Sequence, residues 1–142
     1  MYKIILFLVF LFLIRCSSSE RLVSSVESPP DMHTSQISLD WTGTYQGVLP
    51  CADCPGIETT ITLFDNNTFI LQMKYLGEDP NKVFEQMGRF KWNSKGSAIQ
   101  LHLDPKTTNH YKVGENYLQQ LDIEGNIIQG GLSEHYILEK IL

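Results

Sequence analysis

Apolar and polar residues alternate in short runs along the chain from Trp41 onward. In IETTITLF (57–64), for example, Ile57, Ile61 and Leu63 alternate with polar side chains. A period of two predicts β-strands with one buried face. Turns that contain Asn, Asp or Gly separate these runs at intervals of roughly ten residues. After a first strand before residue 50, the predicted strands are 57–64, 69–76, 83–92, 98–103, 110–113, 116–122 and 127–141.

About eight such strands in about 100 residues predict an all-β antiparallel meander. Closing the meander into a small β-barrel removes the exposed strand edges that promote aggregation, so closure is the preferred arrangement. A sandwich of two sheets satisfies the same pattern and stays an alternative. The interior of an eight-stranded barrel holds packed side chains or one small ligand. We therefore expect one folded domain over residues 41–142.

The N-terminus, MYKIILFLVFLFLIRC, has the features of a bacterial export signal. Lys3 precedes an unbroken apolar run over residues 4–14, which is too short to span a membrane and fits the core of a signal peptide. Cys16 follows, with Leu13 three positions before it, and this arrangement resembles the lipobox of bacterial lipoproteins. Arg15 departs from the small residue usual there, and a plain signal anchor is the alternative. We expect residues 1–15 to be a signal peptide and Cys16 to be lipidated.

Residues 16–40 are rich in Ser, Pro and acidic residues, with few large apolar groups. Such a composition predicts a flexible tether. The chain carries 11 basic and 16 acidic residues, and losing Lys3 and Arg15 with the signal peptide changes the formal charge from -5 to 9 minus 16, or -7. An acidic protein argues against nucleic acid as a partner and against electrostatic adhesion to anionic lipid. The membrane contact is therefore expected through the lipid anchor.

The segment LPCADCPG (49–56) holds Cys51 and Cys54 with two residues between them. In the oxidising space outside the cytoplasm, one interpretation is a local disulfide, although so small a loop adds less stability than the about 3 kcal/mol of a 15-residue loop. A second interpretation is a soft-metal site, because paired thiolates select Cu(I) or Zn(II). Thiol–disulfide catalysis is the third, and it is disfavoured because no helix follows Cys54 to lower a thiol pKa.

Cu(I) accepts two or three ligands, so a further ligand is needed only if the fold brings one near. Thioethers or imidazoles are available from Met73, Met87, His102, His110 and His135. The plainer interpretation places Met73 in the core and the histidines toward solvent. Closed zinc sites need four ligands in recognisable spacing, which the sequence lacks.

Catalytic motifs are missing from the sequence. It contains no nucleophile elbow, no glycine-rich phosphate loop and no zinc-protease helix motif. Glu134 and His135 are adjacent, but neighbours on a strand point to opposite faces and are not expected to act as a pair. We expect that the protein is not an enzyme.

Four stretches together resemble the NlpE family, whose members are outer-membrane lipoproteins of copper resistance and the envelope stress response. These stretches are WTGTYQGVLPCADCPGIETTITL, YLGE, YKVGENYLQQLDIEGN and GGLSEHYILEK. The resemblance is to the N-terminal domain of the family and covers Trp41 to Lys140. It implies a small lipocalin-like β-barrel on a lipid anchor in the outer membrane, facing the periplasm or the cell surface. It also implies a role in copper tolerance, adhesion or surface sensing, and signalling to the Cpx envelope-stress kinase.

Two-domain members of the family continue into a second, OB-like domain with another cysteine pair, which the sequence to Leu142 does not include. Only the pair Cys51 and Cys54 is therefore carried over from the resemblance. Two functions stay open. The first is an envelope lipoprotein of copper tolerance or stress sensing, whose CxxC binds Cu(I) or forms a disulfide. The second is a lipocalin-like module that binds a small ligand and uses the disulfide structurally.

Overall fold

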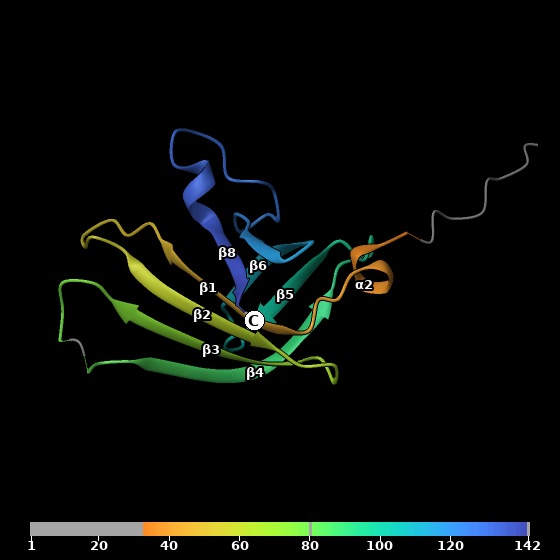
Figure 1. Cartoon of the computed structure of the whole chain (residues 1–142), viewed down its shortest axis with the longest axis horizontal. Coiled ribbons are helices and arrows are strands. Elements are labelled where there is room, and N and C mark those ends of the chain that lie inside the picture. Colours follow the sequence, from red (N-terminus) through yellow and green to blue (C-terminus); the bar gives the residue numbers. More distant parts are fainter. Residues whose placement is uncertain (1–32, 80, 142) are drawn as a thin grey trace, which may run out of the picture.

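A computed structural model describes residues 33–79 and 81–141 of the chain. Eight antiparallel strands follow one another around a closed barrel, and the last pairs with the first (Figure 1). The predicted all-β meander barrel of about eight strands is therefore confirmed. The strands are β1 (Gly43–Leu49), β2 (Ile57–Leu63), β3 (Thr68–Tyr75), β4 (Phe84–Trp92), β5 (Ala98–His102), β6 (Thr108–Gly114), β7 (Tyr117–Gln120) and β8 (Ile137–Ile141). Two short helices accompany them in the described ranges, α2 (Ser35–Ser38) and the 3₁₀-helix η1 (Ser133–Tyr136).

The alternating apolar residues of the strands form the barrel interior. Phe69 and Leu71 of β3, for example, are buried in the interior, whereas Gln72, which follows Leu71 on the opposite face of the strand, is exposed. Side chains from all eight strands contribute to this core and present little or no surface to water, so they pack against one another rather than around a water-filled space. The core consists of Tyr45, Leu49, Ile61, Leu63, Phe69, Leu71, Phe90, Ile99, Leu101, Tyr111, Val113, Leu118 and Leu138.

The strands pair over unequal lengths, which shapes the two ends of the barrel. The pairings of β2 with β1 and with β3 each run over seven residue pairs. The pairing of β1 with β8 covers only three, from Thr44↔Ile141 to Gln46↔Glu139. The long strands β1–β4 therefore extend beyond β5–β8 at the end away from α2 (Figure 1).

Residues before Trp41, where the sequence pattern placed the start of the folded domain, are already in contact with the barrel. The helix α2 already occupies Ser35–Ser38, and the backbone N–H of Gln36 donates a hydrogen bond to the carbonyl oxygen of Gly96 in the β4–β5 turn. Trp41 packs edge-on against Phe90 and Trp92, with ring centroids 5.8 and 5.5 Å apart. The segment is too short and too polar to be recognised as helical, and its order comes from these contacts with the barrel.

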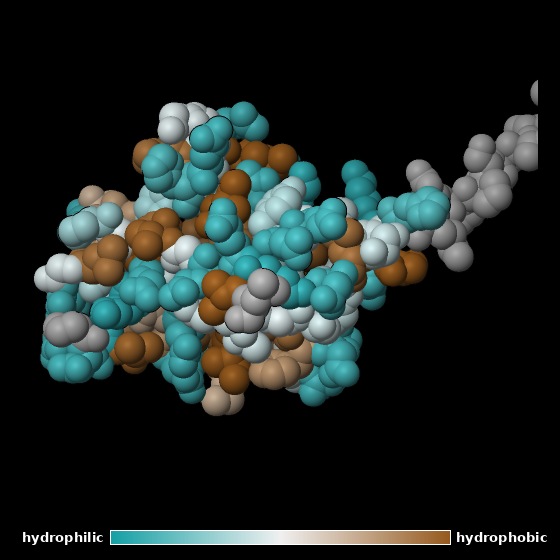
Figure 2. Space-filling model, in the orientation of Figure 1, coloured by the Kyte–Doolittle hydropathy of each residue, from teal (hydrophilic) through white to brown (hydrophobic). Residues whose placement is uncertain are grey.

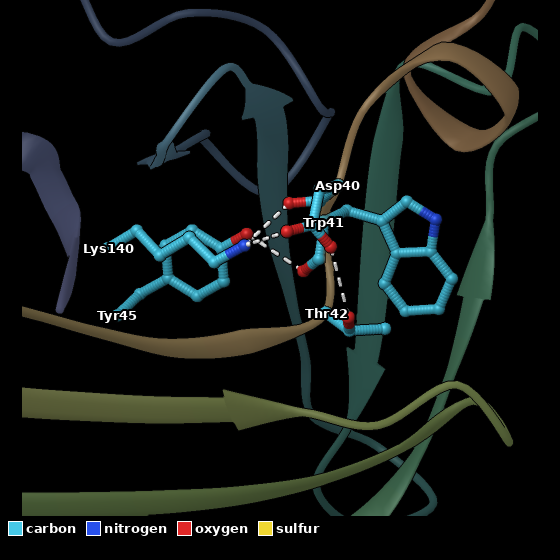
Figure 3. A network of polar contacts seen from close by, with 5 residues as sticks. All are labelled: Asp40, Trp41, Thr42, Tyr45 and Lys140. Atoms are coloured by element: carbon cyan, nitrogen blue, oxygen red, sulfur yellow. Dashed lines mark hydrogen bonds and ion pairs between the residues drawn. The ribbon is translucent and has the colours of Figure 1, made fainter. Parts of the chain in front are cut away.

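A polar network fixes the entry of the chain into β1 (Figure 3). Lys140 of β8 donates to the backbone carbonyl of Asp40 at 2.7 Å and to its carboxylate at 3.0 Å. The Lys140 ammonium holds the pKa of Asp40 below its ordinary value. Tyr45 donates to the carbonyl oxygen of Trp41 at 2.8 Å, and burial, together with the charge of Asp40, raises the pKa of Tyr45 to about 12.

The last predicted strand, 127–141, is wrong in its first part. Only a single bridge, Leu121↔Ile127, forms there, and strand β8 begins at Ile137. Gly130 has φ of +117°, a conformation that interrupts a strand, and η1 follows. Glu134 and His135 therefore lie on a 3₁₀-helix and not on a strand as expected.

No helix in residues 33–79 or 81–141 is both long enough and apolar enough to cross a membrane. The predicted signal peptide (1–15), the lipidated Cys16 and the tether up to residue 32 lie outside the described residues.

Candidate functional site

The cysteine pair lies in the loop 50–56, which joins β1 to β2 at the end of the barrel opposite α2 (Figure 1). The strand pairing below it continues up to Leu49↔Ile57. Pro50 and Pro55 flank the pair, and a proline has no N–H with which to extend the hydrogen-bond ladder. Strand pairing therefore stops here, and the loop holds the two cysteines just beyond the rim of the barrel.

A disulfide bond joins Cys51 to Cys54, whose Cα atoms lie 5.3 Å apart. Both cysteines are half-buried, whereas Ala52 and Asp53 between them are exposed. The Cys54 sulfur lies 3.3 Å from the carbonyl oxygen of Gly56. Because a disulfide sulfur carries no proton, this is a contact in the oxidised protein, and only the reduced thiol could donate a hydrogen bond there.

Gly56 lets the loop return close to β1. A Cβ atom at this position would lie 2.5 Å from Cγ1 of Val48, a distance that real side chains do not tolerate. The residue is buried although it belongs to a loop. Glycine is therefore required for the close approach that positions the disulfide.

An apolar pocket of about 290 Å³ separates the loop 50–56 from the chain around η1. It opens near the place where the β1–β8 pairing ends at Gln46↔Glu139. One wall carries the disulfide and the other carries an imidazole and an exposed leucine. Figure 2 shows apolar side chains on this part of the surface, over the segment 122–136 at the top of the view. The lining residues are Val48, Leu49, Pro50, Cys51, Pro55, Leu132 and His135.

The structure brings one of the five suggested additional ligands to the cysteine pair. His135 lies in the same pocket as Cys51. His102 and His110 lie on β5 and β6, where their strand partners are Arg89 and Gln100.

The two methionines lie elsewhere. Met73 is half-buried and packs against the core, as the plainer interpretation expected. Met87 is 66% exposed on β4. Neither methionine lines the pocket beside the disulfide.

The chemistry open to the pair depends on its oxidation state. The disulfide form offers no thiolate, so a soft metal ion would have to meet the reduced pair. The two thiolates would be donors of the kind that Cu(I) accepts, and the His135 imidazole lines the same pocket as Cys51. In the described part of the chain, no group of three or more His, Cys, Asp or Glu side chains is already arranged to hold a metal ion. The assignment of a metal to Cys51 and Cys54 stays a prediction.

Val48 and Leu132 belong to the site although the sequence pattern does not mark them. Val48 falls in the predicted first strand, and Leu132 falls in the predicted strand 127–141. Their exposure, 48% and 56%, is unusual for large apolar side chains and marks the surface around the disulfide. The pair of glycines before Leu132 was the available signal that a loop, and not a strand, approaches the cysteines.

The comparisons with known proteins agree with the resemblance in the sequence. The family described as NlpE N-terminal domain matches residues 45–131. Lipoprotein NlpE of Escherichia coli (strain K12) is 35% identical over 98 residues, which is 68% of this chain and 39% of that protein. This chain therefore spans well under half the length of that relative.

Two solved structures share the barrel. A candidate lipoprotein from Shewanella oneidensis is 54% identical, with a TM-score of 0.70 over 76% of this chain and 95% of that one. The Cpx pathway activator NlpE from Escherichia coli is 31% identical, with a TM-score of 0.52 over 62% of this chain and 46% of that one.

Proposed function

The chain belongs to the NlpE N-terminal domain family, and from this premise we propose that it is a lipid-anchored envelope protein of copper tolerance or envelope-stress sensing. The observation that carries the proposal is the placement of the Cys51–Cys54 pair. It lies in an outer loop beside an apolar pocket, at the end of the barrel opposite the entry of the chain. A disulfide at this position would add little to the stability of the barrel, since the strands below it are already paired.

The proposed anchor is the lipidated Cys16, in the outer membrane, after removal of residues 1–15. The residues up to 32 would then connect the anchor to α2. A relative is described as an activator of the Cpx pathway, and we propose an envelope-stress sensor kinase as the protein partner. The end of the barrel that carries the loop 50–56 has exposed apolar side chains, among them Val48 and Leu132. Protein-binding surfaces often have such side chains.

The proposed copper chemistry needs no catalysis. Reduced Cys51 and Cys54 would hold Cu(I) as thiolates, with His135 as the nearby imidazole. The bound ion would screen the sulfurs from oxidation and bring η1 toward the loop. An oxidised pair would instead leave the loop closed by its disulfide, so that copper supply and redox state would act on the same segment.

Thiol trapping in cells tests this proposal. Free thiols are alkylated at lysis, with and without added copper, and the peptide containing Cys51 and Cys54 is measured by mass spectrometry. We expect reduced thiols that copper protects from alkylation. A pair that is fully oxidised under both conditions would overturn the copper function and leave a structural disulfide.

Two histidine variants make the test specific. His135→Gln removes the imidazole beside the cysteines, and His102→Gln removes a histidine on the outer face of β5. We expect His135→Gln to weaken the protection by copper and His102→Gln to leave it unchanged. Equal effects of the two variants would contradict a role for the pocket.

The second function that the sequence allows, a lipocalin-like module for a small ligand, has less support. The core side chains from all eight strands fill the barrel interior, whereas lipocalin ligands occupy a hollow one. Uptake of a small apolar fluorescent ligand, blocked by enlarging Met73 but not by replacing the cysteines, would favour this alternative.

A further inference from the structure

Basic side chains gather on the outer face of β4, β5 and β6. Arg89 and Lys91 alternate with the inward Phe90 on β4, and Lys112 lies between the buried Tyr111 and Val113 on β6. The register makes these side chains neighbours, because Arg89 pairs with His102, Lys91 pairs with Gln100, and Gln100 pairs with His110. The turns at the two ends add Lys95 and Lys106. We call this surface the basic face; it consists of Arg89, Lys91, Lys95, His102, Lys106, His110 and Lys112.

Acidic side chains lie at the border of the basic face, with Glu85 farther along the outer face of β4 and Asp122 and Glu124 in the turn that brings Gly125 near His110. None of them forms a salt bridge with this face within the described residues. Residues 88–114 include five Lys and Arg residues but a single acid, Asp104. The Asp104 carboxylate already accepts hydrogen bonds from the backbone N–H groups of Lys106 and Thr107. The salt bridges found within the described residues, Lys82–Glu78 and Lys140–Asp40, lie elsewhere. Basic residues therefore outnumber acidic ones within residues 88–114, although the whole chain has a net charge of -5.

The entry of the chain lies at one edge of this face. The N–H of Gln36 in α2 bonds to the carbonyl oxygen of Gly96, the residue that follows Lys95. The chain that leads toward the proposed anchor therefore meets the barrel beside the basic face. The loop 50–56 belongs to β1 and β2, which lie across the closed barrel from β5 and β6.

We propose that the basic face rests on anionic phospholipid of the membrane that carries the protein's own lipid anchor, an inference that relies on the anchor proposed above. Phosphate headgroups complement a face of lysines and arginines, and the attraction acts within a Debye length of about 8–10 Å. The proposed anchor would confine the barrel to the neighbourhood of the membrane, so that weak electrostatic attraction would suffice to orient it once the basic face comes within a Debye length of the surface. The Cys51–Cys54 loop then faces away from the membrane.

Lysine labelling of the full-length lipidated protein tests this orientation. The protein is reconstituted into vesicles of phosphatidylcholine, with or without phosphatidylglycerol, and exposed lysines are acetylated and measured by peptide mass spectrometry. We expect labelling of Lys91, Lys95 and Lys112 to fall severalfold on the anionic vesicles. Labelling of Lys74 and Lys82, outside the basic face, should stay unchanged and serves as the internal control.

Salt, free phosphate and charge variants separate the possible outcomes. High salt should restore labelling, because it screens the attraction. The variant Lys91→Gln/Lys112→Gln should lose the protection of Lys95, and the matched variant Lys74→Gln/Lys82→Gln should keep it. Equal thermal unfolding midpoints would show that both variants fold. Equal labelling on the two kinds of vesicle would overturn the proposal. Protection by dissolved inorganic phosphate or heparin, without protection by vesicles, would also overturn it and would indicate a soluble polyanion as the ligand.

The anchor itself is tested in the same experiment. A lipidated protein floats with vesicles of phosphatidylcholine alone, whatever the basic face does. Failure to float would overturn the proposed anchor, whereas flotation without protection would overturn the orientation only.

Discussion

Gly88 shows how a single residue adjusts the interior of the barrel. It lies opposite Phe69 in the β3–β4 register, and a Cβ atom at Gly88 would lie 2.8 Å from the Phe69 ring and 2.9 Å from the carbonyl oxygen of His102. Because one of these neighbours is backbone, the clash cannot be relieved by side-chain rotation alone. We predict that Gly88→Ala lowers the free energy of unfolding by about 1–3 kcal/mol.

Urea unfolding followed by circular dichroism measures this effect. Gly131→Ala is the matched control, because a Cβ atom at Gly131 meets no atom within 4 Å. The control should change the free energy of unfolding by no more than about 0.5 kcal/mol. Equal stability of Gly88→Ala and the unmodified protein would mean that the barrel relaxes around the added methyl group.

The ion pair of Asp40 and Lys140 predicts a dependence of stability on pH. The hydrogen bond and charge of Lys140 lower the pKa of Asp40 from its ordinary value of 3.8. A carboxylate with a lowered pKa in the folded state adds stability above that ordinary value, and this is lost as the pH falls through the lowered pKa. We predict that Asp40→Asn is less stable than the unmodified protein at neutral pH and that the difference shrinks in acid.

Unfolding in urea across a pH series measures the difference. The same substitution in a Lys140→Gln background should have a smaller effect at neutral pH, because the partner charge is gone. An effect of Asp40→Asn that is the same in both backgrounds, or independent of pH, would contradict the ion pair as its cause.

Among the elements, the loop 50–56 is expected to contribute little to the stability of the barrel. The disulfide between Cys51 and Cys54 closes a loop of very few residues, and the β1–β2 pairing beside it is complete up to Leu49↔Ile57. On the chain-entropy model, so short a loop contributes at most about 2 kcal/mol. We therefore predict that Cys51→Ser/Cys54→Ser remains folded and loses no more than this amount of stability.

Thermal and urea unfolding of the double variant, compared with the chemically reduced unmodified protein, provide the measurement. Both should retain the circular dichroism spectrum of the barrel. A variant that unfolds at room temperature would show that the disulfide is required by the fold, which would weaken its proposed role in copper binding or redox sensing.

The elements also show how far sequence patterns reach. Strands with strict alternation, such as β2 and β3, were predicted within a few residues because a period of two in burial appears directly in the residue types. No local pattern predicts α2, because contacts with residues outside the helix hold it in place. Gln36 bonds to Gly96, which is distant in sequence, and Trp41 donates a hydrogen bond to the carbonyl oxygen of Gln36. The segment before β8 was mistaken for strand because its apolar residues were counted without the effect of Gly130.

For the candidate site, the sequence identifies the cysteine pair but does not predict which other residues lie close to it. The cysteine pair stands out through its spacing and its flanking prolines. The proximity of His135 to Cys51 depends on how β8 and β1 separate at Gln46↔Glu139, a feature of strand pairing that no local pattern encodes. Three histidines were equally plausible ligands until the barrel placed two of them on its opposite side.

At the scale of the whole molecule, net charge is a poor guide to what the surface attracts. The count of 16 acidic against 11 basic residues argued against contact with anionic lipid. Folding separates these charges, because alternation on β4 and β6 directs Arg89, Lys91 and Lys112 to one outer face. Electrostatic attraction depends on this local arrangement within a Debye length, and not on the sum over the chain.

The arrangement of the two ends leads to a prediction for the anchored protein. Entry of the chain at α2 and the loop 50–56 lie at opposite ends of the barrel, and the loop lies across the barrel from the basic face (Figure 1). After reduction, we predict that Cys51 and Cys54 react with a bulky maleimide at the same rate on anionic vesicles as in detergent. A cysteine introduced by Ser38→Cys in α2 should react more slowly on the vesicles, because it lies near the membrane. Equal slowing at both positions would place the disulfide loop against the lipid and would contradict the proposed orientation.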